Sequence, residues 1–114
     1  MLASPRRLTT TAQFQQIFKE GRAARADGLV AKTLPTPGVP TRFGVVVSKK
    51  VAKEAVKRNR IRRLLREALR KNLGGIKEGY AVALLVLPNF QPQTSKEAEV
   101  LLLKLFKKAG LLSP

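Results

Sequence analysis

The residues best suited to chemistry lie in one stretch, Ser48 to Lys71, which holds eleven of the 23 Lys and Arg residues. Only two acids, Glu54 and Glu67, lie among them, so the stretch carries a net charge of +9 (11 minus 2). Six of the eleven cations are Arg, whose planar guanidinium suits phosphate groups and base edges. The chemistry that such a stretch can do is the binding of a polyanion.

A helix from about Glu54 to Asn72 would sort this stretch into two faces. At about 100° per residue, one narrow apolar stripe collects Ile61, Leu64, Leu65, Ala68 and Leu69. The opposite side collects Asn59, Arg62, Arg63, Arg66 and Arg70. A merely solvated face is the alternative, but the acids that would pair with these arginines at i,i+4 are nearly absent. We therefore expect nucleic-acid binding, with Arg58, Asn59 and Arg60 pointing in three directions around the helix.

Several kinds of chemistry are excluded by composition. The chain contains no Cys and no His, which excludes disulfides and thiol or imidazole catalysis. Its seven acids are spread along the chain without metal-ligand spacing on one helix face, and it has no glycine-rich phosphate-binding loop. We therefore predict no catalytic residue and no metal ligand.

Length and charge indicate one small RNA- or DNA-binding domain over residues 1–114. The 114 residues are 44% apolar, enough for one core, and the net charge of +16 with a pI near 11.5 favours a polyanionic partner. Residues 1–8 form a basic N-terminal arm and contain no apolar signal core. The longest apolar run, Tyr80 to Pro88, is too short to span a bilayer. We expect a cytoplasmic protein without a membrane partner.

A short helix is predicted before the basic one, over Ala12–Glu20. The Thr9–Thr11 cluster offers an N-cap, and Gly21 is a suitable C-terminal stop. Phe14, Ile17 and Phe18 lie on one face of this helix. The two phenylalanines fit either of two roles, plain core or a surface on which unpaired bases stack.

Three strands can be placed from the residues: Leu29–Leu34, Arg42–Ser48 and Tyr80–Leu87. The second is apolar or small on both faces, which predicts a central strand covered on both sides. Strand, basic helix and strand read as a crossover unit with parallel pairing. A last helix begins near Thr94–Glu97, which has capping-box spacing, and ends near Ala109. Its Lys104, Lys107 and Lys108 are either solvated or additional phosphate contacts.

Two segments resemble the bacterial ribonuclease P protein component. They are Lys57–Glu67, preceded by Val47–Lys50, and Phe14–Arg22. The resemblance implies a small single-domain α+β sandwich with an approximately four-stranded mixed sheet in the order α-β-β-β-α-β-α. It also implies a likeness to domain 2 of ribosomal protein S5 and a left-handed crossover, although general rules favour a right-handed one.

The resemblance also implies two RNA-binding sites. The basic helix and the turn before it would bind the catalytic RNA through Lys49, Lys50, Lys53, Lys57, Arg58, Asn59, Arg60, Arg62, Arg63, Arg66 and Arg70. A groove would hold the single-stranded 5′ leader of precursor tRNA through Phe14, Phe18, Arg22, Lys32, Val45 and Val47. Family members usually carry aromatics on the first strand, whereas here Leu29 and Lys32 stand near those places, which implies a groove that relies more on charge.

The implied activity is removal of the leader by ribonuclease P, with the protein as accessory subunit and catalysis in the RNA. No covalently bound cofactor is expected, and Mg²⁺ would be held mainly by the RNA. The expected partners are the catalytic RNA, with one protein per RNA, and precursor tRNA. A ribosomal or other structural RNA-binding protein is the alternative. A DNA-binding protein that inserts the basic helix into a major groove is a third class, which would predict a symmetric dimer.

Overall fold

The computed structural model describes residues 6–113, so most of the predicted N-terminal arm, residues 1–5, lies outside the described part. The strands are β1 (Arg22–Ala26), β2 (Leu29–Pro35), β3 (Arg42–Val47) and β4 (Tyr80–Val86). The helices are α1 (Thr11–Glu20), α2 (Ala55–Lys71) and α3 (Ser95–Ala109), with a 3-10 turn at Leu73–Gly75. This is the predicted α-β-β-β-α-β-α order.

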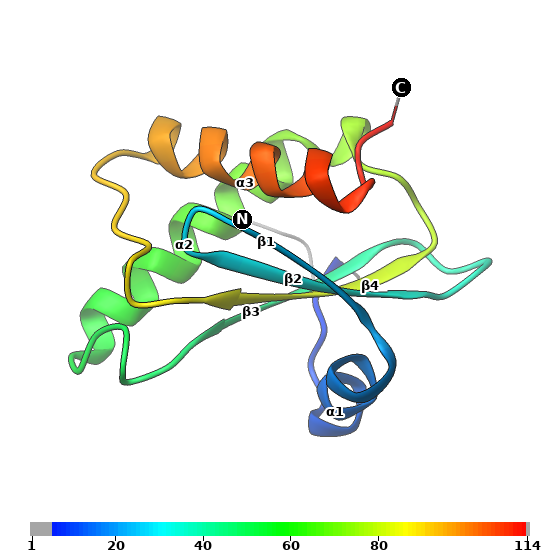
Figure 1. Ribbon diagram of the computed structural model, residues 1–114, viewed down its shortest axis with the longest axis horizontal. Helices are drawn as coiled ribbons and strands as arrows, with labels where there is room; N and C mark the ends of the chain where they lie inside the picture. Colours follow the sequence, from blue (N-terminus) through cyan, green and yellow to red (C-terminus); the bar gives the residue numbers. More distant parts are fainter. Residues whose placement is uncertain (1–5, 114) are drawn as a thin grey trace.

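The strands form one mixed sheet in the order β1-β2-β4-β3, with helices on both faces. Helices α2 and α3 lie together on one face, and α1 lies alone on the other (Figure 1). Strands β3 and β4 pair in parallel across the α2 crossover, as predicted, and the other neighbours are antiparallel. The handedness of this crossover stays a prediction from the resemblance.

The two faces of the sheet bury very different amounts of apolar surface. Under α2 and α3 lies a large cluster that contains Phe43, Leu65, Leu84 and Phe106. Under α1 the buried cluster is only Leu8, Ile17, Ala81 and Ala83, with Phe14 and Leu34 packed against it. The stability of the domain therefore comes mainly from the α2 and α3 side.

Strand β1 is the element that the residue pattern did not place. Its sequence RAARA has low strand propensity, and it is held by antiparallel pairing with β2, from Arg22↔Thr33 to Ala26↔Leu29. The sequence does contain a signal, the two-residue turn Asp27-Gly28, in which both residues have positive φ (49° and 85°). Asp-Gly is a strong hairpin signal for a turn of this kind.

Strand β3 lies at an edge of the sheet, so the prediction of a central strand was wrong. Both of its faces are nevertheless covered at Phe43 and Gly44, and its outer edge is partly paired. Arg7 bridges to Phe43, and the Leu8 N–H donates to the Phe43 carbonyl at 2.8 Å. Strand β3 is thus apolar on both faces because helices cover both of them, and Arg7 and Leu8 cover part of its outer edge.

The helix boundaries follow the predicted caps. Thr10 and Gln13 form a capping box on α1. Gly21 is the C-cap of that helix, and glycine is required there because a Cβ would lie 2.4 Å from the Ile17 carbonyl oxygen. Thr94 caps α3 through the Glu97 N–H, and Gly110 ends it with a left-handed φ of 74°. Across residues 6–113, the structure holds no helix that is both long and apolar enough to span a membrane.

Candidate nucleic-acid interface

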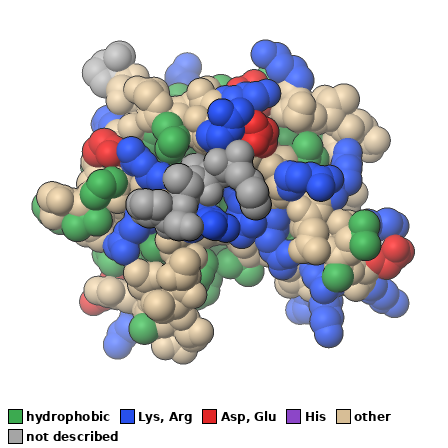
Figure 2. Space-filling view, turned by 180° about the vertical axis from the view of Figure 1, so that it is seen from behind, with side chains coloured by type: hydrophobic (Ala, Val, Ile, Leu, Met, Phe, Trp, Pro, Cys, Tyr) green, Lys and Arg blue, Asp and Glu red, His purple; other side chains and the backbone are tan. Residues whose placement is uncertain are grey.

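Helix α2 presents the predicted apolar stripe to the core. Ile61, Leu65, Ala68 and Leu69 are buried, and Leu64 is half-buried. The outward side is the arginine surface, which we define as Asn59, Arg62, Arg63, Arg66 and Arg70. On the side of the molecule seen in Figure 2, Lys and Arg side chains far outnumber acids.

The centre of the arginine surface crowds three guanidinium groups. Burial, together with the charges of Arg7 and Arg62, lowers the pKa of Arg66. A hollow of about 420 Å³ lies here, lined by Asn59, Arg62, Arg63, Arg66 and Glu67. The positive charges repel one another unless an anion lies between them, so this is a place where a phosphate would be strongly favoured.

Internal hydrogen bonds orient part of this surface. The Asn59 Oδ1 accepts from Arg62 Nη1 at 2.6 Å. Glu67 accepts from Arg70, and this hydrogen bond lowers the pKa of Glu67 to about 2 and raises that of Arg70. Arg62 and Arg70 are thereby pre-oriented, and their remaining N–H groups can still donate outward.

Arg58, Asn59 and Arg60 point in three directions, as predicted, and they have different partners. Arg58 Nη1 donates to the carbonyls of Ala52 (3.0 Å) and Lys53 (2.7 Å), so this side chain braces the turn before α2. Arg60 Nη2 donates to the Gln93 carbonyl at 3.2 Å, which ties α2 to the loop before α3. Among these three residues, Arg58 is therefore the one most committed to the fold.

The predicted lysines lie around the start of α2. Lys49, Lys50, Lys53 and Lys57 are all exposed. Lys57 lies 3.6 Å from Glu54, a loose and solvent-exposed ion pair. These cations extend the arginine surface toward the turn after β3, and they leave the positive charge there free for an external anion.

The face under α1 carries the aromatic pair. The Phe14 and Phe18 rings lie 6.1 Å apart, and Phe18 is 37% exposed. Phe14 is half-buried because its ring lies on Gly44, where a Cβ would come within 2.2 Å of the ring. Phe14 therefore packs against the sheet, whereas Phe18 faces solvent, and stacking of a base on either ring stays a prediction.

The sheet rows show which strand residues share this face with the phenylalanines. Lys32, Ala83 and Gly44 are register partners in one row, and Lys32 Nζ donates to the Phe18 carbonyl at 2.9 Å. The next row contains Val30, Leu85 and Val46, of which Leu85 and Val46 are half-buried. We call Phe14, Phe18, Lys32, Val46 and Leu85 the aromatic face.

The structure removes three predicted leader-binding residues from this face. Val45 and Val47 are 9% and 4% exposed and lie in the large core under α2 and α3. Arg22 pairs with Thr33, and it lies on the same face of the sheet as Ala24 and Ala31, which is the face covered by α3. Arg22 lines a pocket there together with the end of α3. Leu29, which stands near a family aromatic position, is also fully buried in the large core. The prediction for Val45 and Val47 was wrong about their side of β3, because both sides of this strand are apolar; Val46, with Leu85 of β4, is on the side of the phenylalanines.

Five of the seven acids are in ion pairs with Lys or Arg, namely Asp27, Glu54, Glu67, Glu78 and Glu99. Glu78 accepts from Arg6 at 2.5 Å, which lowers the pKa of that carboxyl, and Asp27 lies 3.2 Å from Lys104. Glu99 accepts a hydrogen bond from Asn72 at 2.8 Å. Within residues 6–113, no three acidic side chains gather in a group that could hold a metal ion.

Comparison with known proteins identifies the family. The sequence model of the family described as Ribonuclease P matches residues 2–110. A ribonuclease P protein component of Synechococcus sp. (strain JA-2-3B'a(2-13)) is 36% identical over 98% of this chain and 87% of its own length. The solved structure of the Staphylococcus aureus RNase P protein matches over 95% of this chain and 98% of its own, with a TM-score of 0.85 and 26% identity.

The Thermotoga maritima RNase P protein is a second structural relative, with a TM-score of 0.79 and 28% identity over 89% of this chain and 94% of its own. The agreement therefore extends from sequence to fold over almost the whole chain. This chain belongs to the ribonuclease P protein component family.

Proposed function

We propose that this chain is the protein subunit of ribonuclease P, which binds the catalytic RNA through the arginine surface and the 5′ leader of precursor tRNA through the aromatic face. The observation that carries this proposal is the separation of two unlike surfaces by one sheet. Crowded guanidinium groups lie outside α2, and a solvent-facing aromatic ring lies on α1 across the sheet.

The arginine surface suits the backbone of a folded RNA. Its cations neutralise phosphates and release counterions, which gives affinity without reading sequence. Lys49, Lys50, Lys53 and Lys57 would widen the contact beyond the helix. A phosphate in the hollow lined by Arg62, Arg63 and Arg66 would relieve the repulsion between Arg62 and Arg66.

The aromatic face suits an unpaired strand. A base of any identity can stack on Phe18, and the aliphatic Val46 and Leu85 side chains offer an apolar floor beside it. The Lys32 side chain extends from β2 to the last turn of α1, where its ammonium group donates to the Phe18 carbonyl and supplies a positive charge near the aromatic pair. Such a face would favour precursor over mature tRNA, because only the precursor carries the leader.

Catalysis in this proposal belongs to the RNA subunit with Mg²⁺. In the described part of the chain, residues 6–113, most carboxylates are in ion pairs and no three of them form a group that could hold metal ions. The protein therefore contributes binding and positioning.

Cleavage of a 5′-extended precursor tRNA at low Mg²⁺ tests the proposal, with catalytic RNA alone, protein alone and both together. We expect efficient cleavage only in the mixture. If the mixture is no better than the RNA alone, the chain is a general or ribosomal RNA-binding protein instead. If the protein alone cleaves, the assignment of catalysis to the RNA is wrong.

A further inference from the structure

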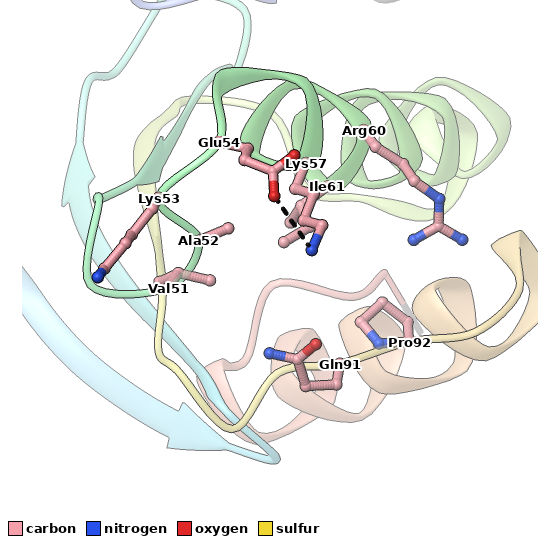
Figure 3. Close-up of a pocket in the computed structure, with 9 residues that line it drawn as sticks. All are labelled: Val51, Ala52, Lys53, Glu54, Lys57, Arg60, Ile61, Gln91 and Pro92. Carbon is pink, nitrogen blue, oxygen red and sulfur yellow. Dashed lines mark ion pairs between the residues drawn. The ribbon is translucent and has the colours of Figure 1, made fainter.

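A pocket of about 600 Å³ lies where the start of α2 faces the loop before α3. One wall is the turn of Val51 and Ala52 with the first turns of α2, and the opposite wall is Gln91 and Pro92 (Figure 3). Its volume is in the range of pockets that bury a small organic ligand. No local sequence pattern predicts a role for Gln91 or Pro92.

The pocket combines an apolar lining with four different polar groups. Val51, Ala52, Ile61 and Pro92 supply the apolar part. From α2, Lys57 and Arg60 extend toward the opposite wall, and Glu54 extends beside Lys57, whereas Lys53 extends away from these side chains (Figure 3). Gln91 Nε2 donates to the Pro88 carbonyl at 2.9 Å, which holds the amide and leaves its oxygen free to accept.

Hydrogen bonds fix the walls of the pocket relative to each other before any ligand enters. Arg58 braces the turn through the Ala52 and Lys53 carbonyls, and Arg60 bonds the Gln93 carbonyl across the opening. Behind the second wall, Phe90 is fully buried and closely approached by Gly28. A ligand would therefore meet a preformed site.

We infer that this pocket accepts one unstacked nucleotide of the catalytic RNA, with its base inside and its phosphate on the cationic rim. A bare phosphate would use Lys57 and Arg60 but would leave the apolar lining unused and would approach the Glu54 carboxylate. A base that carries an amino group instead donates to the Glu54 carboxylate or to the Gln91 oxygen, and its ring covers the apolar lining. The pocket adjoins the exposed lysines at the start of α2, on the α2 side of the sheet, which favours the catalytic RNA over the leader.

This inference rests on the proposed function, and chemical probing of the catalytic RNA in the protein–RNA complex tests it. Ala52→Leu fills the pocket without changing charge, and the Ala52 carbonyl that accepts from Arg58 remains. Ala55→Leu is the matched control, because Ala55 is exposed and does not line the pocket. We expect one nucleotide of the RNA to be protected by the unchanged protein and by Ala55→Leu, and to become reactive with Ala52→Leu.

The affinity for the catalytic RNA should fall roughly 10-fold or more in Ala52→Leu, the loss expected when a base no longer makes its charge-assisted hydrogen bond with Glu54. If Ala52→Leu proves to be unfolded, Gln91→Ala at the exposed rim should give the same new reactivity with a smaller loss of affinity. Equal footprints and affinities for Ala52→Leu and Ala55→Leu, while Arg62→Ala still weakens binding, would overturn the pocket and leave the proposed function intact. Protection of a precursor tRNA nucleotide in place of one in the catalytic RNA would overturn the choice of partner.

Discussion

The two faces of the sheet use the same kinds of residue in opposite ways. On the α2 and α3 side, the apolar residues are closed into a large core and the cations face outward. On the α1 side, the buried cluster is small and part of the apolar and aromatic surface stays open. The comparison indicates that one face supplies stability and a charged exterior, whereas the other leaves apolar and aromatic surface open, and this is the surface to which the proposed function assigns the leader.

The largest expected effect concerns the two cores. Leu65→Ala, in the α2 core, should lower the free energy of unfolding by about 2 to 5 kcal/mol because it leaves a cavity among closely packed neighbours. Ile17→Ala, in the small cluster under α1, should cost less because fewer side chains surround it. Denaturant unfolding of both variants measures the difference. An equal or larger cost for Ile17→Ala would contradict the unequal division of stability.

Arg62→Ala should weaken binding to the catalytic RNA by roughly 1.5 to 3 kcal/mol, through loss of a charge-assisted contact. Arg25→Ala is the matched control, since Arg25 lies exposed on β1, away from the arginine surface. Filter binding at moderate salt gives both affinities. An effect of the same size in both variants would mean that net charge, and not this surface, determines affinity.

Phe18→Ala should weaken the affinity for precursor tRNA by on the order of 1 kcal/mol, at the low end of the range for a stacked base because only part of the ring is exposed. Binding of mature tRNA should not change. Phe14→Ala should lower the thermal midpoint more than Phe18→Ala does, because the Phe14 ring packs on Gly44. Unfolding of both variants to the same extent would assign both rings to the core.

Sulfate should raise the thermal midpoint of the free protein, because an anion relieves the repulsion around Arg66. The gain should shrink in Arg66→Gln, and that variant without sulfate should be as stable as the unchanged protein or slightly more stable. A thermal scan over sulfate concentration measures both effects. An unchanged sulfate gain in Arg66→Gln would move the anion site elsewhere.

The smallest expected effect is on acid stability. Glu67 has a folded pKa of about 2 against an ordinary value of 4.5, and the pKa of Glu78 is also lowered. A carboxyl whose pKa is lowered by folding stabilises the fold at pH values above its ordinary pKa. This stabilisation is lost as the pH falls toward the pKa of the folded state. Glu67→Gln should therefore lose less stability than the unchanged protein between about pH 5 and pH 2. The free energy of unfolding of both proteins is measured across this pH range. An equal loss of stability in Glu67→Gln and in the unchanged protein would refute the prediction.

Most of the fold could be predicted because its signals are local. The positions of residues around the α2 helical wheel predicted Ile61 and Leu65 in the core and Arg62 and Arg66 outside. The capping residues Thr10 and Thr94 indicated where α1 and α3 begin. Strand β1 was not predicted from the residue pattern because its alanines and arginines have low strand propensity and form a strand only by pairing with β2. The Asp27-Gly28 pair nevertheless marked the turn between the two strands.

The site was predictable on α2 and less so on the sheet. A helix with one apolar stripe has only one possible inward side, whereas β3 is apolar on both sides, and tertiary packing alone decides that Val45 and Val47 face the core while Val46 does not. The pocket wall at Gln91 and Pro92 comes from a segment distant in sequence from α2, and no local pattern joins the two. Contacts between distant segments are what sequence periodicity does not encode.

The most direct test of the central claim is a pair of affinities, for the catalytic RNA and for the leader, measured in Arg62→Ala and in Phe18→Ala. The affinity for the leader is obtained as the difference between the binding free energies of precursor tRNA and mature tRNA to the complete ribonucleoprotein. We predict that Arg62→Ala weakens the first affinity alone and Phe18→Ala the second alone. If each variant weakens both affinities in the same proportion, the two faces do not hold two different RNAs.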